Sequence, residues 1–200
     1  MKRLLLTSLF FVAFAIAFHA QPPSTPANGC SNETVEKISS RGIKIGTKID
    51  DLLSLFATDE TQKVQLRNSA SGPDSKHLGF EFFGVQPLPI DVKPDGKFDG
   101  ISSYVFTLLD EKLAGFTVRY SRPKWKDSKQ FAETMIAALS LPTIDKWERD
   151  DTLYCGDYKL FVSNSGTFVI EDRRLNTIIA ERKKKYEEDQ RIADLKKFRP

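Results

Sequence analysis

The sequence predicts an α+β fold: an antiparallel sheet with two short helices packed on one face and a charged C-terminal helix. Two pairs of apolar–polar alternating segments, each pair joined by a short polar turn, predict hairpins at 101–121 and 158–171. Short amphipathic helical patterns precede both groups of strands. The last 25 or so residues are helical in pattern and densely charged. Helices segregated from antiparallel strands in this way are typical of the α+β class.

Residues 1–20 have the layout of a secretory signal peptide. Lys2 and Arg3 precede an apolar run, and small residues follow it, so we expect cleavage after Ala17 or Ala20. The run is shorter than the ~20 apolar residues that a membrane-spanning helix needs. We therefore expect a periplasmic or secreted protein with no membrane span once the signal is removed.

The charge balance argues against a nucleic-acid partner. The chain has 30 basic and 27 acidic residues, and removing the leader with Lys2 and Arg3 leaves 28 against 27. A nearly neutral chain lacks the long-range attraction that draws basic proteins to nucleic acid. The remaining ~180 residues are enough for one domain with a sizeable core.

Residues 21–40 are rich in Pro, Ser and Asn, which predicts a flexible N-terminal arm. The arm carries Cys30, and the one other cysteine is Cys155. Two cysteines in an exported chain favour a disulfide, whereas two free thiols would be expected in a reducing compartment. A bond across so long a loop stabilises a fold by ~4–5 kcal/mol in the chain-entropy model.

The α+β domain is expected over residues 41–175. Its first helix is predicted to begin at Thr47, with Asp50 in the capping-box position. Apolar residues then recur at helical spacing, namely Ile49, Leu52, Leu53 and Phe56. Residues 58–78 are polar and predict a loop, followed by an aromatic-rich strand at 78–85 and a Pro- and Gly-containing loop at 86–100.

The clearest hairpin joins strands 101–109 and 112–121. In the second strand the pattern places one set of side chains on the buried face, namely Ala114, Phe116, Val118 and Tyr120.

The second helix begins at Asp127 as N-cap, with Gln130 in the box position, and ends before Pro142. Its expected core stripe is Phe131, Met135, Ala138 and Leu139. A second hairpin follows at 158–163 and 167–171, with turn residues between its strands. This order is consistent with two helix-then-strands units, 41–121 and 127–175.

Residues 176–200 predict the charged C-terminal helix. Opposite charges four residues apart, such as Glu181 with Lys185, support an isolated helix. Only Ile178 and Ile179 provide an apolar anchor, so we expect most of the helix to project into solvent; the alternative is a partner-binding helix.

The segment Ile45-Gly46-Thr47-Lys48-Ile49-Asp50-Asp51-Leu52 resembles a motif of the SmpA/OmlA outer-membrane-assembly lipoprotein family, which also opens the repeats of β-lactamase-inhibitor-like proteins. That resemblance covers Gly46, Thr47 and the following helix, and it implies helices on one face of an antiparallel sheet. Through Ser140-Leu141-Pro142 and Trp147, the chain is also similar to uncharacterised exported bacterial proteins. Neither resemblance implies an activity.

The sequence carries no recognisable catalytic constellation. Without the leader, His77 is the single histidine, and the chain has no P-loop, no G-x-G-x-x-G and no G-x-S-x-G. We expect no catalytic residue, metal or cofactor. The favoured hypothesis is an exported non-enzymatic binding or interaction protein, whose partner is an unknown protein or envelope component. The alternative is an exported hydrolase with an unrecognised active site, for which His77 is the available base.

Trp125 and Trp147 flank the second helix in charged surroundings, which makes them candidate partner contacts. Half-buried packing at the sheet edge is nevertheless the favoured interpretation, since tryptophan is usually well buried.

Overall fold

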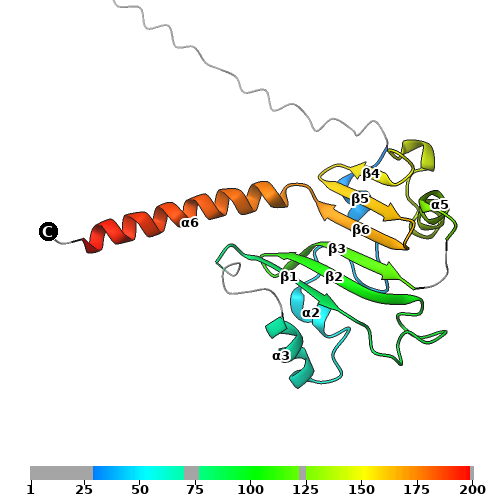
Figure 1. Ribbon diagram of the computed structural model, residues 1–200, viewed down its shortest axis with the longest axis horizontal. Helices are drawn as coiled ribbons and strands as arrows, with labels where there is room; N and C mark the ends of the chain where they lie inside the picture. Colours follow the sequence, from blue (N-terminus) through cyan, green and yellow to red (C-terminus); the bar gives the residue numbers. More distant parts are fainter. Residues whose placement is uncertain (1–28, 70–76, 122–124, 199–200) are drawn as a thin grey trace, which may run out of the picture.

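The computed structural model describes residues 29–69, 77–121 and 125–198, and it confirms the predicted α+β class. Its centre is a six-stranded antiparallel sheet with the order β1-β2-β3-β6-β5-β4 (Figure 1). The strands are β1 Phe80–Val85, β2 Ile101–Leu109, β3 Lys112–Tyr120, β4 Thr152–Cys155, β5 Tyr158–Ser163 and β6 Thr167–Asp172. The helices are α1 Asn32–Glu36, α2 Ile49–Leu53, α3 Glu60–Ser69, α5 Ser128–Leu139, the 3₁₀ turn η1 Ile144–Lys146, and α6 Leu175–Lys197.

Two three-stranded meanders meet at the centre of the sheet. Strands β1 to β3 form one meander and β4 to β6 the other, and β3 pairs with β6. This central pairing runs over only four positions, from Phe116 opposite Ile170 to Arg119 opposite Thr167. Both meanders nevertheless contribute to one hydrophobic core.

The core lies between the sheet and α1, α2 and α5. Val35 from α1, Leu52 from α2 and Phe131 from α5 are all fully buried. They pack in one cluster with buried side chains from every strand, including the facing pair Phe106 and Phe116. Burial of each large apolar side chain contributes about 1.5–3 kcal/mol, so this layer supplies the main stabilisation of the fold.

A β-bulge changes which residues of β3 face the core. Leu113 lies opposite Leu108, but Gly115 lies opposite Thr107, so Ala114 is an extra residue without a partner in the register. As a result Leu113 is buried and Ala114 is only partly buried, which corrects the prediction that Ala114 faces the core. The sequence alternation alone does not reveal the added residue.

The expected flexible arm at 21–40 is wrong for the part that the structure describes, residues 29–40. Helix α1 begins after Ser31, whose hydroxyl accepts the Thr34 N–H in a capping box. Cys30 and Val35 are fully buried. The apolar residues of this segment fill the core beside β4, which outweighs its turn-rich composition.

Helix α3 lies where a loop was expected at 58–78. Asp59 accepts the Gln62 N–H at 2.8 Å, and the Gln62 amide oxygen accepts the Thr58 N–H at 2.8 Å. These reciprocal bonds cap the helix. Arg67 then joins α3 to the β2–β3 turn through Glu111 at 2.8 Å.

Thr47 does not cap α2 as predicted. Its hydroxyl donates to the Lys44 carbonyl at 2.7 Å, and Lys48 occupies the N-cap without a side-chain cap bond. The backbone here instead pairs with β3: the Gly46 N–H donates to the Leu113 carbonyl, and the Leu113 N–H donates to the Thr47 carbonyl, both at 2.8 Å.

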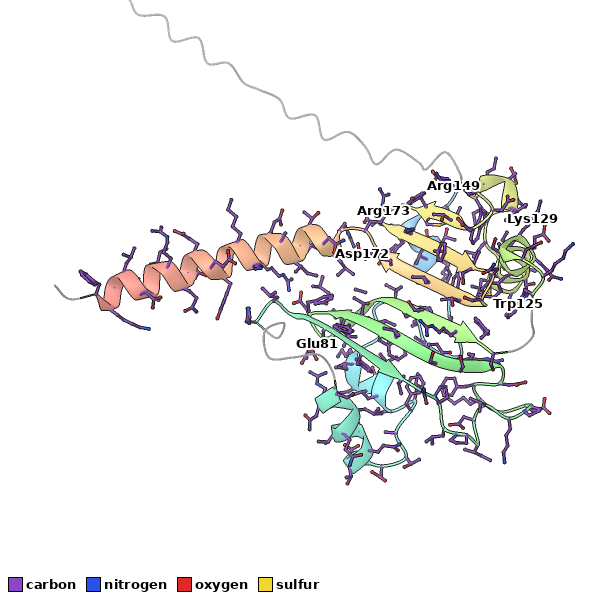
Figure 2. All side chains as sticks on the ribbon, viewed as in Figure 1. Glu81, Trp125, Lys129, Arg149, Asp172 and Arg173 are labelled. Atoms are coloured by element: carbon purple, nitrogen blue, oxygen red, sulfur yellow. A yellow bond between two sulfur atoms is a disulfide. The ribbon has the colours of Figure 1, made fainter. Side chains whose placement is uncertain are left out.

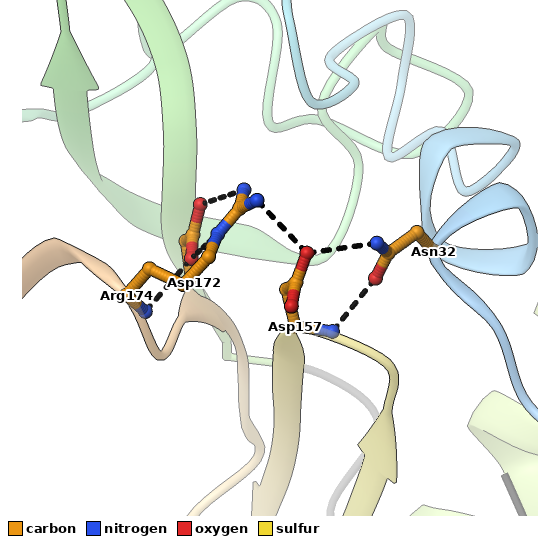
Figure 3. Close-up of polar contacts among 4 residues, drawn as sticks. All are labelled: Asn32, Asp157, Asp172 and Arg174. Carbon is orange, nitrogen blue, oxygen red and sulfur yellow. Dashed lines mark hydrogen bonds and ion pairs between the residues drawn. The ribbon is translucent and has the colours of Figure 1, made fainter. Parts of the chain in front are cut away.

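A polar network fixes the start of α6 (Figure 3). Arg174 donates to both carboxylate oxygens of Asp172, at 2.9 and 2.7 Å, and lies 2.8 Å from Asp157. Asp157 in turn accepts from the Asn32 side-chain amide at 2.9 Å and donates its N–H to Asn32 at 2.7 Å. The network therefore links α1, the β4–β5 turn, the end of β6 and α6.

Helix α6 leaves the body after its first three turns. Arg182 donates to Asp110 at 2.7 Å and to the Leu78 carbonyl at 2.8 Å, and the His77 ring stacks on Tyr186 with centroids 4.0 Å apart. Beyond Tyr186 the helix extends away from the sheet (Figure 1). Within the described ranges no helix combines the length and apolar character needed to cross a lipid bilayer.

The predicted Cys30–Cys155 disulfide is present, with Cα atoms 4.6 Å apart and both residues fully buried. We expect the Cys30→Ser, Cys155→Ser double variant to melt roughly 10 °C or more below the wild type, because the bond closes a long loop. Differential scanning calorimetry with and without reductant measures the effect. Reductant should lower the melting temperature of the wild type and leave that of the variant unchanged. Equal melting temperatures of wild type and variant without reductant would contradict the prediction.

Asp172 makes the stability of the protein depend on pH. Burial acts to raise the pKa of Asp172, but the hydrogen bonds and charge of Arg174 outweigh it and lower that pKa. A carboxylate whose pKa is lower in the folded state stabilises the fold above its unfolded pKa of about 3.9, and that stabilisation is lost as the pH falls further.

We expect Asp172→Asn to lower the free energy of unfolding at pH 7 by about 1–3 kcal/mol. The difference from the wild type should shrink below about pH 4. Urea denaturation across this range tests it, with Asp189→Asn on the exposed part of α6 as control. A difference that is the same at every pH would contradict it.

Candidate functional site

A cavity of about 850 Å³ opens between α5, the end of β3 and the turn that follows α1. Its wall is aromatic and aliphatic and consists of Tyr120, Trp125, Phe131, Met135, Ala138 and Leu139. Its rim is formed by the accessible polar residues of the lining, Ser39, Arg41, Asp99 and Thr134, whereas Ser40 and Gly100 of the same lining are buried. Figure 2 shows Trp125 beside α5 at the end of the sheet.

Three aromatic rings pack against one another in the wall. The Trp125 and Phe131 ring centroids lie 4.3 Å apart, and Tyr120 lies 5.7 Å from Phe131 and 6.0 Å from Trp125. Phe131 is fully buried, whereas Tyr120 and Trp125 keep part of their surface exposed. The two exposed rings therefore offer a fixed aromatic surface to a ligand.

The β5–β6 turn holds Trp125 in place. The Tyr120 N–H donates to the Gly166 carbonyl at 2.8 Å, which brings this turn against the end of β3. Gly166 has φ +75°, and a Cβ at this position would lie 2.8 Å from the Trp125 ring. Glycine is thus required both by the backbone conformation and by the close approach of the indole.

Helix α5 provides the aliphatic part of the wall. Its N-cap is the predicted Asp127, whose carboxylate accepts the Gln130 N–H at 2.8 Å. Phe131 and Met135 of the predicted core stripe are buried, but Ala138 is exposed and Leu139 half-buried. Ala138 and Leu139, at the C-terminal end of that stripe, therefore line an open cavity and are not fully buried in the core.

A tight turn presents Arg41 at the rim. Ser40 and Ile43 exchange both backbone hydrogen bonds, at 2.9 and 3.0 Å, and the two residues between them have positive φ, +54° at Arg41 and +88° at Gly42. This left-handed conformation costs a non-glycine residue roughly 1–2 kcal/mol. The Arg41 guanidinium donates to the Asp99 carbonyl at 3.4 Å.

Two tyrosines lie close to Ser40, the buried Tyr104 and the half-buried Tyr120. The Ser40 and Tyr104 hydroxyls are hydrogen-bonded at 3.3 Å, and both residues are buried. Burial raises the pKa of Tyr104 and of Tyr120, an effect that hydrogen bonding to Ser40 opposes only in part. Both phenols therefore stay protonated at neutral pH and carry no negative charge.

The two predicted tryptophan contacts have different surroundings. Trp125 lines the cavity, but Trp147 is only 6% exposed and its indole N–H donates to the Pro142 carbonyl at 3.0 Å. Trp147 thus packs in the core beside η1, which agrees with the favoured packing interpretation and not with a partner contact.

The groups that the hydrolase alternative would use do not meet in the cavity. His77 stacks on Tyr186 of α6 and is absent from the cavity lining. Its sequence neighbours Asp74 and Ser75 lie outside the described residues. Among the residues that the structure describes, no group of three or more His, Cys, Asp or Glu side chains could hold a metal ion.

Comparison of the chain with protein-family models, with curated proteins and with solved structures finds no match. The resemblance of the Gly46-Thr47 segment to the SmpA/OmlA motif therefore stays a prediction.

We expect the two tryptophans to differ in solvent access. Acrylamide should quench the fluorescence of the Trp147→Phe protein, which retains Trp125, more strongly than that of the Trp125→Phe protein, which retains Trp147. The reason is that Trp125 faces the open cavity whereas Trp147 is buried. Stern–Volmer constants measured on both proteins test this, with free N-acetyltryptophanamide as the fully exposed reference. Equal constants for the two proteins would contradict the described cavity.

Proposed function

We propose that the protein is an exported, non-enzymatic binding protein that holds a small ligand with an apolar body in the cavity beside α5. The observation that carries the proposal is the cavity itself. Its volume of about 850 Å³ is within the 300–1,000 Å³ typical of ligand sites, and its apolar wall with a few polar groups at the rim is the usual composition of such sites.

The same lining gives less support to the hydrolase alternative. Nucleophilic catalysis by a hydroxyl needs a base within hydrogen-bond reach. Hydroxyls line the cavity at Ser39, Ser40 and Thr134, but the described lining includes no histidine, lysine or glutamate, and Asp99 is its single carboxylate. Binding of a ligand requires no nucleophile and no base. A binding function is therefore the simpler explanation of this lining.

Export is supported by two features. The first 20 residues have the pattern of a signal peptide. The Cys30–Cys155 bond fits an oxidising compartment, where disulfides persist. A ligand drawn from the cell envelope or from the surrounding medium agrees with this location.

The proposal predicts saturable binding of an apolar probe, followed through Trp125 fluorescence in the Trp147→Phe background. We expect 1-decanol to change the emission with a hyperbolic dependence on concentration. Ala138→Phe, which fills the cavity, should weaken the apparent affinity at least tenfold. Ala137→Phe is the matched control, because Ala137 is an exposed neighbour outside the cavity lining.

Circular dichroism confirms that both variants fold. A response that is not saturable would overturn the proposal, as would equal weakening in the two alanine variants.

A further inference from the structure

We infer that the ligand is an apolar molecule with one negatively charged carboxylate-type head, and that Arg41 binds that head. This inference rests on the proposed function, because it names the class of ligand for the same cavity. It starts from Arg41, an exposed residue that lines the same cavity as the aromatic wall.

The backbone at Arg41 adopts a conformation that is uncommon for arginine. Asn, Asp or Gly is the usual residue at a left-handed position of a two-residue turn, because an arginine there is strained. Other non-glycine residues with positive φ, among them Glu111 and Arg149, lie outside the cavity lining, so Arg41 is distinguished by its place in that lining. The turn cannot be moved easily, since the Ser40 hydroxyl is buried against Tyr104.

The side chain at this position is suited to a carboxylate. A guanidinium presents a planar set of donors that matches a carboxylate or phosphate, and its charge persists at any physiological pH. The Ser39 hydroxyl lies on the same rim as a further donor. The protonated phenol of Tyr120 adds no negative charge beside it.

Asp99 restricts the charge of the head. Asp99 belongs to the same lining, and its carbonyl accepts the hydrogen bond from Arg41. One negative charge on the ligand would pair with Arg41, the single cation of the described lining, whereas a second would be left to the repulsion of Asp99. The rim therefore favours a monoanion such as a carboxylate over a dianionic phosphate.

The apolar wall sets the size of the body. From Phe131 to Leu139, α5 advances about 12 Å at 1.5 Å per residue, which suits an extended chain of about ten carbons. Trp125 and Tyr120 close one side of this path with aromatic surface.

The test compares four probes with the same chain and different heads: decanoate, 1-decanol, decylammonium and decyl phosphate. Each is titrated at pH 8, at low ionic strength and below its micelle-forming concentration, into the full-length Trp147→Phe protein. We expect decanoate to bind about tenfold or more tighter than each of the other three, as a charge-assisted hydrogen bond allows.

Three variants test whether Arg41 is the source of the preference for decanoate. Arg41→Gln and Arg41→Asn should both abolish the preference for decanoate over 1-decanol. Lys44→Gln, which removes a nearby exposed cation outside the cavity lining, should keep the preference. Arg41→Asn should also raise the melting temperature, because asparagine tolerates the left-handed backbone.

The outcomes separate the two proposals. Equal affinities for all four probes would overturn the carboxylate inference and leave the proposed binding function standing. The inference also fails if decyl phosphate binds most tightly, or if Arg41→Gln keeps the preference for decanoate. Absence of saturable binding for every probe would overturn the binding function itself.

Discussion

The pairing of β3 with β6 is the contact on which the rest of the structure depends. Only four residue pairs join the two meanders, and the strands approach so closely that a Cβ at Gly115 would lie 2.7 Å from the Ile170 carbonyl oxygen. At one end of this pairing, Tyr120 and the Gly166 turn support Trp125 and thus the cavity. At the other end Asp172 fixes the start of α6. The cavity and α6 therefore lie at opposite ends of the β3–β6 pairing.

The parts of the fold with strong local patterns could be predicted from the sequence. The two hairpins and the Asp127 cap follow from alternation and capping chemistry. Helix α3 was missed because it has no apolar stripe, although Asp59 with Gln62 carried a readable capping signal. The segment of α1 was missed because its packing partners are distant in sequence. The bulge at Ala114 leaves no trace in the alternation, since it depends on register with β2.

Only part of the candidate site could be predicted from the sequence. Trp125 stood out as an unusual residue, but its role depends on α5, on the Gly166 turn and on the rim, which meet only in the folded chain. The two tryptophans have similar sequence surroundings, and tertiary packing alone makes one a cavity wall and the other a core residue. Arg41-Gly42 could have been read as a two-residue turn, yet nothing local shows that it borders a cavity.

The separation of Cys30 from Cys155 also imposes an order in time. The two residues are 125 positions apart, so at a synthesis rate of about 5–20 residues per second Cys30 emerges roughly 6–25 s before its partner. During that interval β4 does not yet exist, and α1 lacks the surface on which it docks. The N-terminal segment is synthesised first, but it is therefore among the last parts of the chain to dock onto the sheet. Until then Cys30 is a thiol open to exchange, and the growing chain needs the second meander before it can protect the first cysteine.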